Sequence, residues 1–291
     1  MITILSNIFI LLGIFLGVLF SYHQFKKYLA TIKPKPIIDT NDFWNAIIVI
    51  ALSSFIGGRP YHVINYWEYY LQHPIKILTV WEGGIGVIGA IVFGLWGLIA
   101  FSLVRFKRIP PAIIIADFVA LGLPLAHAVG RWSNYFSYNF LGAPTKLPWG
   151  IEIPFNARPV GYKLYTTYHP LFLYESLLNL ILFVFLCLVF IKFKARKSGS
   201  VALLYLIGFS LIRLFTEPLL LNSWKVGVFP VASVVSFVIL TLSTIVLASM
   251  YIPLVIPRSK LPTKSVVVKR EIKKSKSQIK KFRIQRKRKS K

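Results

Sequence analysis

Residues 170–191 read PLFLYESLLNLILFVFLCLVFI, an apolar run that contains one charged side chain, Glu175. A helix needs about 20 consecutive apolar residues to cross the hydrocarbon core of a bilayer. The run therefore predicts a membrane-spanning helix. Because a carboxylate is costly to hold in hydrocarbon, Glu175 must have a partner, and Arg59 and Arg131 are both candidates.

Other apolar runs of this kind recur along the chain, which has 291 residues, is 56% hydrophobic and has a mean hydropathy of +0.65. In the second run, Gly57, Gly58 and Pro60 favour an irregular far end. We predict an all-α integral membrane protein with about seven transmembrane helices. The runs cover residues 3–21, 44–66, 84–104, 111–130, 170–191, 201–216 and 228–256.

Basic residues in the short connections predict the orientation, because lysine and arginine accumulate on the cytoplasmic side of membrane proteins. Three alternate connections carry them. This pattern places those connections and the C-terminus in the cytoplasm, and the N-terminus outside. The residues are Lys26, Lys27, Lys33 and Lys35, then Arg105, Lys107 and Arg108, then Lys192, Lys194, Arg196 and Lys197.

Positive charge is concentrated at the C-terminal end of the chain. Of 35 lysines and arginines, 16 lie in residues 258–291, and the net charge is +26. A segment with so few apolar residues cannot bury a core. We predict a seven-helix membrane domain at 1–257 and a disordered basic cytoplasmic tail at 258–291 that contacts anionic lipid headgroups. Nucleic-acid or ribosome contact by the tail is an unspecific alternative, and no specific nucleic-acid partner is expected.

The single cysteine, Cys187, lies inside an apolar run. A disulfide within the chain and a cysteine-based metal site are therefore excluded. The N-terminus lacks the early basic residues and the small-residue cleavage site of a signal peptide. This composition favours a first run that is retained as a span.

Charged residues in or beside the spans are the candidates for function. Arg213 and Glu217 are spaced i, i+4, so they share one helix face. Two interpretations remain open: an ion pair that braces the fold, or a cavity where Arg213 binds an anion while Glu217 orients it or handles a proton. The complete set, with two histidines, is Arg59, Asp117, His127, Arg131, His169, Glu175, Arg213 and Glu217.

Arg131 ends the fourth run, and Asn134 follows three residues later. The planar fork of a guanidinium suits phosphate, and a polar cluster at a membrane boundary favours recognition of a lipid headgroup. Snorkelling of Arg131 to the interface is the alternative. The connection 131–169 is the longest between the predicted spans, and long connections inside a compact fold are usually functional.

Two further features have a simple structural interpretation beside a functional one. His169 precedes the fifth run and is either a hydrogen-bonded structural residue or a base. The glycines at 84, 86, 89 and 94 allow a helix or a lipid to approach the backbone closely, and helix packing is the simpler interpretation.

Six blocks, in order, resemble the prolipoprotein diacylglyceryl transferase family. The third is similar to the family signature Gly-Arg-x-Gly-Asn-Phe-x-Asn-x-Glu-x-x-Gly. The blocks are Gly57-Gly58-Arg59-Pro60-Tyr61, Trp81-Glu82-Gly83-Gly84, Gly130-Arg131-Trp132-Ser133-Asn134-Tyr135-Phe136 to Gly142, Leu147-Pro148-Trp149-Gly150-Ile151, His169-Pro170-Leu171-Phe172-Leu173-Tyr174-Glu175, and Arg213-Leu214-Phe215-Thr216-Glu217.

The chain departs from the family pattern at several positions. Ile88 stands where the family often has a histidine, four residues after the Gly-Gly pair, and Phe209 stands where it has a tyrosine. The signature carries Ser133, Ser137 and Asn139 in place of its second Gly, its second Asn and its Glu. The tyrosine expected in the first span has no counterpart around residues 6–9. These departures leave the general base unidentified.

The resemblance implies transfer of the diacylglyceryl group of phosphatidylglycerol to the lipobox cysteine of a prolipoprotein, in the bacterial inner (cytoplasmic) membrane. It implies a thioether product and release of glycerol phosphate, with no metal or cofactor. The expected partners are phosphatidylglycerol, the signal peptide with its lipobox, and membrane lipids. The expected catalytic residues are Arg131, Arg213, Glu217 and His169, and the expected phosphatidylglycerol-binding residues are Arg131, Asn134, Gly142, Arg59, Tyr174 and Glu175.

Three alternatives stand beside this enzyme. One is a catalytically weakened scaffold that binds lipid or signal peptides, which the changes at Ile88, Asn139 and Phe209 motivate. Another is a transporter of an anionic lipid or small anion, which would use the same arginines. The last is a membrane anchor for the basic tail.

Overall fold

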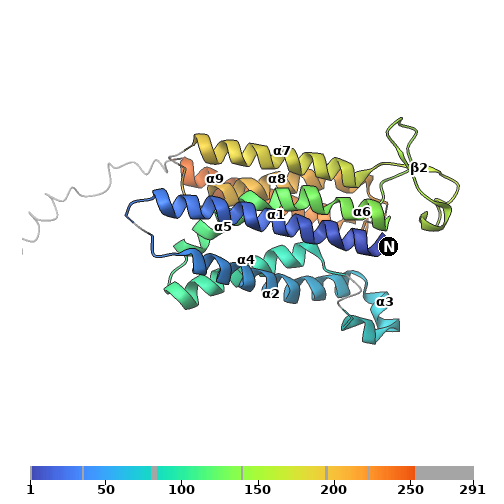
Figure 1. Cartoon of the computed structure of the whole chain (residues 1–291). Coiled ribbons are helices and arrows are strands. Elements are labelled where there is room, and N and C mark those ends of the chain that lie inside the picture. The colour runs from blue at the N-terminus through green and yellow to red at the C-terminus, as the bar shows by residue number, and fades with distance from the viewer. Residues whose placement is uncertain are drawn as a thin grey trace, which may run out of the picture. The chain divides into compact units, whose positions relative to one another are not determined.

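Only structures that satisfy their own backbone hydrogen bonds can cross hydrocarbon, so long apolar runs form helices there. The computed structural model describes residues 2–34, 36–79, 84–138, 140–193, 196–221 and 223–252. Within those ranges seven helices are long and apolar enough to span a membrane, which confirms the predicted all-α membrane fold. Figure 1 shows them lying side by side.

The spanning helices are α1 (Ile2–Thr31), α2 (Thr40–Asn65), α4 (Val87–Phe106), α5 (Pro110–Gly130), α7 (Leu171–Lys192), α8 (Ser200–Thr216) and α9 (Val231–Tyr251). The short helices are α3 (Trp67–Gln72), α6 (Trp132–Ser137), η1 (Pro74–Ile77), η3 (Phe155–Ala157) and η4 (Glu217–Leu219). The strands are β1 (Ile151–Glu152), β2 (Thr167–Tyr168), β3 (Lys225–Val226) and β4 (Phe229–Pro230).

The predicted irregular end of the second span is wrong, because α2 continues without a break through Pro60 to Asn65. A proline is tolerated inside a span where neighbouring protein satisfies the backbone. The carbonyl that Pro60 leaves without its helical donor is that of Ile56. A separate bond supports the neighbouring turn, because the backbone N–H of Gly86 donates to the carbonyl of Gly58 at 2.9 Å. The segment before α4 therefore supports this part of α2.

Small residues bring the helices together in two pairs. A side chain at Gly17 would place Cβ 2.7 Å from the Gly122 carbonyl oxygen, so α1 and α5 are in contact through their backbones. A side chain at Gly89 would likewise place Cβ 2.6 Å from the carbonyl of Gly57. The interpretation of the glycines before and within α4 as helix-packing residues is therefore confirmed for Gly89, which packs on α2.

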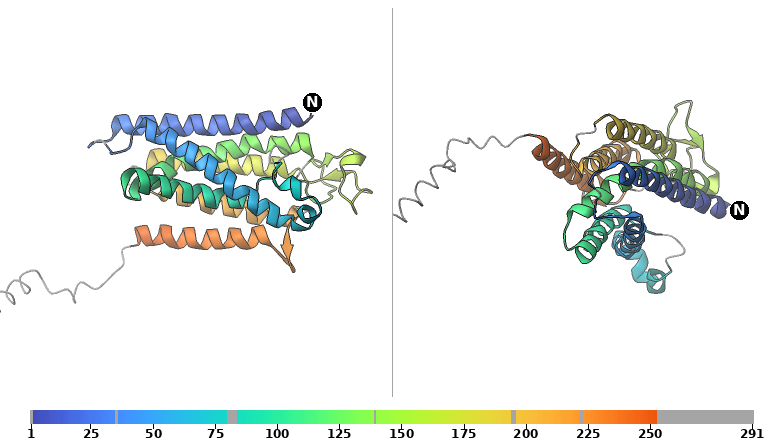
Figure 2. Two further views of the ribbon diagram at one scale, coloured as in Figure 1. Left: turned by 90° about the horizontal axis from the view of Figure 1, so that it is seen from below. Right: turned by 60° about the vertical axis from the view of Figure 1, so that its left-hand side comes forward.

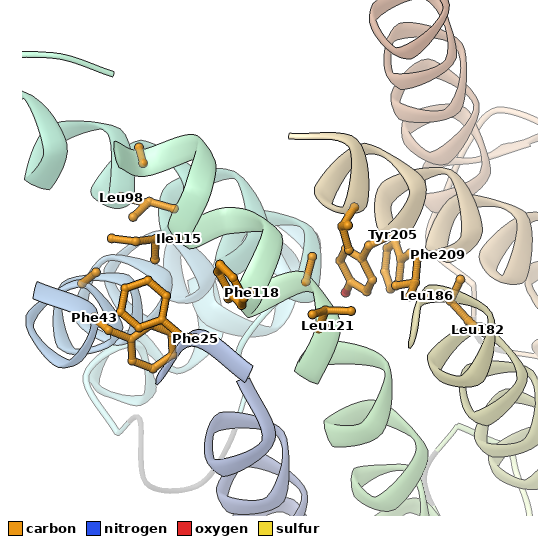
Figure 3. Close-up of a cluster of buried hydrophobic side chains, with 14 of the residues drawn as sticks. Phe25, Phe43, Leu98, Ile115, Phe118, Leu121, Leu182, Leu186, Tyr205 and Phe209 are labelled. Atoms are coloured by element: carbon orange, nitrogen blue, oxygen red, sulfur yellow. The ribbon is translucent and has the colours of Figure 1, made fainter. Parts of the chain in front are cut away.

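A continuous apolar core joins these pairs to α7 and α8 (Figure 3). Phe25 of α1 stacks on Phe43 of α2 with ring centroids 5.0 Å apart and meets Phe118 of α5 edge-on at 5.2 Å. Leu186 of α7 and Tyr205 of α8 continue the cluster. The core thus fixes α2 and α4 relative to the other helices.

Asp117 is part of this framework. It is buried in α5, and its two carboxylate oxygens accept hydrogen bonds from the backbone N–H groups of Gly199 at 2.7 Å and Ala202 at 2.9 Å. These groups lie at the N-terminal end of α8, where N–H groups lack partners within the helix. Asp117 therefore stabilises the start of α8.

The long connection after α6 forms a small head. β1 pairs antiparallel with β2, with Ile151 opposite Tyr168, and Gly142 pairs with Leu220 after η4. Figures 1 and 2 show this head at the same end of the helices as the start of α1 and the short helix α3. The junctions of α1 with α2, α4 with α5 and α7 with α8, which carry the basic residues, lie at the other end (Figure 1). The orientation of these two ends in a membrane stays a prediction.

Some predicted features lie outside the described residues. They are Trp81, Glu82 and Gly83 of the second block, Asn139 of the third, Lys35, Lys194 and the basic tail at 258–291. The described residues up to 248 group as one compact unit. The division between a membrane domain and a tail at residue 257 stays a prediction.

Candidate functional site

A cavity of about 680 Å³ opens among the helices near the head. Its wall contains the two guanidiniums of Arg131 and Arg213, the carboxyl group of Glu217 and the imidazole-bearing residue His62. The remainder of the wall is mainly aromatic and aliphatic. It includes Tyr61, Tyr66, Ile85, Ile88, Ile91, Tyr138, Phe140, Leu141, Phe209, Trp224, Ala232 and Ile239.

Glu175 joins the two arginines. Its side chain is 1% exposed, and its Oε1 lies 3.2 Å from Nη1 of Arg213. Its Oε2 pairs with Nη2 of Arg131. The hydroxyl of Thr216 also donates to Oε1, at 2.8 Å. Of the two partners predicted for Glu175, Arg131 is therefore confirmed, and one carboxylate from α7 holds guanidiniums from α5 and α8.

The predicted pair of Arg213 and Glu217 is also present. Glu217 is 2% exposed, and its other oxygen accepts a hydrogen bond of 2.5 Å from the hydroxyl of Ser223. Both carboxylate oxygens are thus engaged. The ion pair is therefore confirmed, and Arg213 and Glu217 also line the cavity, whereas the binding of an anion there stays a prediction.

The arginines keep unused hydrogen-bond donors. A guanidinium carries five N–H groups. Within the described part of the chain, Arg131 has one ion pair, and Arg213 has two. Nε and Nη1 of Arg131 and Nε of Arg213 therefore have no partner among the described residues. Donors at a cavity wall in this state are suited to an anionic ligand.

Phe140 covers both guanidiniums, and sequence reasoning did not single it out. Its ring centroid lies 4.6 Å from Cζ of Arg131 and 5.4 Å from Cζ of Arg213. Such contacts attract a cation to the face of the ring. Its φ of 61° and the φ of 50° at Tyr138 lie in the left-handed region, which is unusual for aromatic residues. Backbone strain of this kind gathers at functional sites.

Arg59 lies in a different environment from the two arginines of the cavity wall, and its predicted contact with phosphatidylglycerol stays a prediction. It is buried in α2 and is not among the described residues that line the cavity. Its Nε donates to the carbonyl of Ile77 and its Nη1 to that of Gly84, both at 3.0 Å, and Nη2 donates to the carbonyl of Lys76. Arg59 therefore holds the connection between α3 and α4 against α2.

Gly142 and Asn134 lie near the cavity wall without lining it in the described chain. A Cβ on Gly142 would lie 2.6 Å from Cβ of His169 and 2.7 Å from its carbonyl oxygen, so two head segments cross at this glycine. Asn134 is half-buried in α6, beyond Arg131. Their predicted contact with phosphatidylglycerol stays a prediction.

His169 and Tyr174 form a separate polar chain in the head. The indole N–H of Trp149 donates to the hydroxyl of Tyr174 at 2.7 Å, and Nδ1 of His169 lies 3.1 Å from the same hydroxyl. Neither His169 nor Tyr174 is among the described residues that line the cavity. The tertiary structure separates His169 from Arg131 and Arg213, with which it was grouped as a catalytic residue, and this role stays a prediction.

His62 was not among the residues that the sequence singled out, although it adjoins the first of the six blocks. It lies in the last turn of α2 and lines the cavity together with Ile88 of α4. Its proximity to the block that ends at Tyr61 was the one signal available. His127 of α5 instead packs in the core against Phe209, with ring centroids 5.7 Å apart.

Comparison with known proteins gives one family. Residues 7–249 match the family described as prolipoprotein diacylglyceryl transferase. A phosphatidylglycerol–prolipoprotein diacylglyceryl transferase of Acaryochloris marina is 38% identical over 215 residues, which cover 74% of this chain and 76% of the relative. Proteins of the same name from Fervidobacterium nodosum and Gloeobacter violaceus are each 36% identical, over 77% and 79% of this chain and 74% and 82% of their own lengths.

Proposed function

The chain belongs to the prolipoprotein diacylglyceryl transferase family, and from this membership we propose that it transfers the diacylglyceryl group of phosphatidylglycerol to the lipobox cysteine of bacterial prolipoproteins. The product is a thioether, and the leaving group is glycerol phosphate. The observation that carries the proposal is that two arginines with unused donors line one cavity of a multi-pass membrane protein.

The phosphate of the lipid occupies the space in front of Arg131 and Arg213. Two arginines and the carboxylates of Glu175 and Glu217 balance in formal charge. Attraction by excess positive charge therefore contributes little, and binding depends on directed N–H donors. Such donors stabilise a phosphate ester most when its negative charge grows as it leaves, because they are already oriented.

In the reaction, the cysteine sulfur attacks the glyceryl carbon that carries the phosphate ester. A carbon–sulfur bond forms, the carbon–oxygen bond breaks, and glycerol phosphate leaves with the electron pair. The thiol must first lose its proton, since the thiolate is the nucleophile. The arginines then have two effects, because they favour the thiolate and they stabilise the leaving phosphate.

Glu175 and Glu217 orient the guanidiniums that bind the lipid. Glu175 pairs with both arginines. Glu217 pairs with Arg213 through one carboxylate oxygen and accepts a hydrogen bond from Ser223 through the other. Asn134 adds a hydrogen-bond donor beside Arg131. Gly142, Tyr174 and His169 contribute by shaping the head beside the cavity. Arg59 contributes by holding the connection that precedes α4 against α2.

The apolar part of the cavity supports a site for the acyl chains. Ile88 and Ile91 of α4 and Ala232 and Ile239 of α9 contribute to its wall. α9 buries Ser236 and Ser243 alone among its residues. An opening between α4 and α9 would let a lipid enter from the bilayer with its headgroup at the arginines.

The remaining parts of the proposal follow from the reaction. The acceptor is a secreted prolipoprotein whose signal peptide presents the lipobox at the membrane surface, which places the enzyme in the inner membrane of a bacterium. The basic tail contacts anionic lipid headgroups. The reaction as written needs neither a metal ion nor a dissociable cofactor.

The deciding experiment uses the purified full chain in phosphatidylglycerol micelles with a synthetic lipobox peptide, and reads the peptide mass. The expected result is a gain of one diacylglyceryl group that is absent with a Cys→Ala peptide. Lipid and peptide binding without a mass gain, with an active relative as control, would identify a scaffold. Movement of labelled lipid across vesicles without product would identify a transporter.

A further inference from the structure

The cavity contains an imidazole that the family pattern does not assign. The chain has five histidines, and His62 is the one that lines the cavity with Arg131 and Arg213. His127 packs in the core, and His169 bonds Tyr174 in the head. His23 and His73 are exposed on α1 and just after α3. An imidazole beside an anion site can remove a proton at neutral pH.

Ile88, which stands where the family often has a histidine, lies in the wall of the same cavity. The two residues come from different helices, His62 from α2 and Ile88 from α4. A Cβ built on Gly84 would lie 2.7 Å from Nε2 of His62, so the imidazole touches the segment that leads into α4. The cavity therefore has an imidazole at its wall although position 88 is apolar.

The other titratable side chains at the wall are poorer proton acceptors. Glu217 pairs with Arg213 and accepts from Ser223, so both of its carboxylate oxygens are already engaged. A phenol must lose its own proton before it can act as a base, and the wall contains the phenols of Tyr61, Tyr66 and Tyr138. A base must also reach the proton that it removes, directly or through one water.

We propose that His62 is the general base that removes the proton of the prolipoprotein thiol, from α2 instead of from position 88. The inference rests on the proposed transferase function. Nε2 or Nδ1 of neutral His62 accepts the thiol proton as sulfur bonds to the glyceryl carbon and the carbon–oxygen bond breaks. The imidazolium then returns the proton to the released glycerol phosphate or to water, so the enzyme ends unchanged.

The test compares four forms of the full chain in the peptide assay: the native protein, His62→Gln, Ile88→His, and the double variant. A general base contributes about 10²–10⁴-fold to a rate. We expect His62→Gln to lower kcat about 100-fold with little change in the KM for phosphatidylglycerol. We expect the double variant to recover at least about tenfold, because it returns an imidazole to the same cavity. His73→Gln, an exposed histidine outside the cavity, is the matched control and retains native activity.

Two results would overturn the assignment. One is a His62→Gln enzyme within about threefold of the native rate. The other is a loss that Ile88→His does not restore while circular dichroism and thermal unfolding match the native protein, because then a cavity imidazole is not what the enzyme lacks. Absence of transfer by the native protein would instead count against the proposed function itself, so the two failures are distinguishable.

Discussion

Glu175 Oε1 and Arg213 Nη1 lie 3.2 Å apart, although the two residues belong to different helices and the carboxylate is buried. The same carboxylate also pairs with Arg131. A carboxylate shared by two arginines fixes the distance between their guanidiniums, and a ligand that needs both of them finds them already placed. Preorganised donors of this kind are the main source of electrostatic catalysis.

Removal of the shared charge tests this arrangement. Glu175→Gln leaves two partly buried guanidiniums facing a buried amide, and breaking a buried ion pair by removing one partner costs about 3–5 kcal/mol. We expect a marked fall in thermal stability together with loss of transfer, measured by unfolding in detergent and by peptide mass. Glu152→Gln, at an exposed head position, is the control and changes neither. Unchanged stability of Glu175→Gln would show that the carboxylate does not hold the arginines.

The arginines themselves have a predicted catalytic effect. Arg131→Ala and Arg213→Ala each remove oriented donors, and loss of one such donor group costs about 10²–10³-fold in kcat. We expect at least that loss in each purified variant, with insertion into the membrane retained. Arg108→Ala, an exposed arginine between α4 and α5, serves as control. Normal transfer by both variants would remove the phosphate site from these residues.

Phe140 offers a test that separates its ring from its backbone. Loss of contact with two cations costs about 1–2 kcal/mol if the ring is partly desolvated, which is roughly a tenfold fall in rate. We expect Phe140→Ala and Phe140→Gly to lose activity about equally. We expect Phe140→Gly to be the more stable of the two, because its φ of 61° suits glycine. Equal stability of the two variants would mean that the left-handed backbone stores no strain.

Gly142 is expected to be required for a steric reason. Its substitution by alanine places a Cβ 2.6 Å from that of His169, so the head segments must move apart. We expect Gly142→Ala to lower stability and transfer together. Gly130→Ala is the matched control within the same signature, because no described atom lies within 4 Å of its added Cβ and alanine favours helix by about 0.5–1 kcal/mol. Equal tolerance at both positions would contradict the steric explanation.

Much of the fold follows from the sequence alone, because the length of an apolar run and the need to satisfy the backbone in hydrocarbon are local properties. The seven spans and the pair of Arg213 with Glu217 were predictable in this way, the latter because i and i+4 share a helix face. The resemblance to the prolipoprotein diacylglyceryl transferase family was also recognisable from the six sequence blocks.

Tertiary structure alone decided how the helices share their polar groups. It paired Glu175 with Arg131 and Arg213, directed Arg59 to backbone carbonyls, and left His169 in the head. It also brought His62 to the cavity wall and laid Phe140 over the two guanidiniums. Contacts between helices depend on which faces meet and on how the helices are shifted along their axes. Close packing at residues such as Gly17 and Gly89 sets both relations, and each of these glycines is distant in sequence from the residue that it meets on the neighbouring helix.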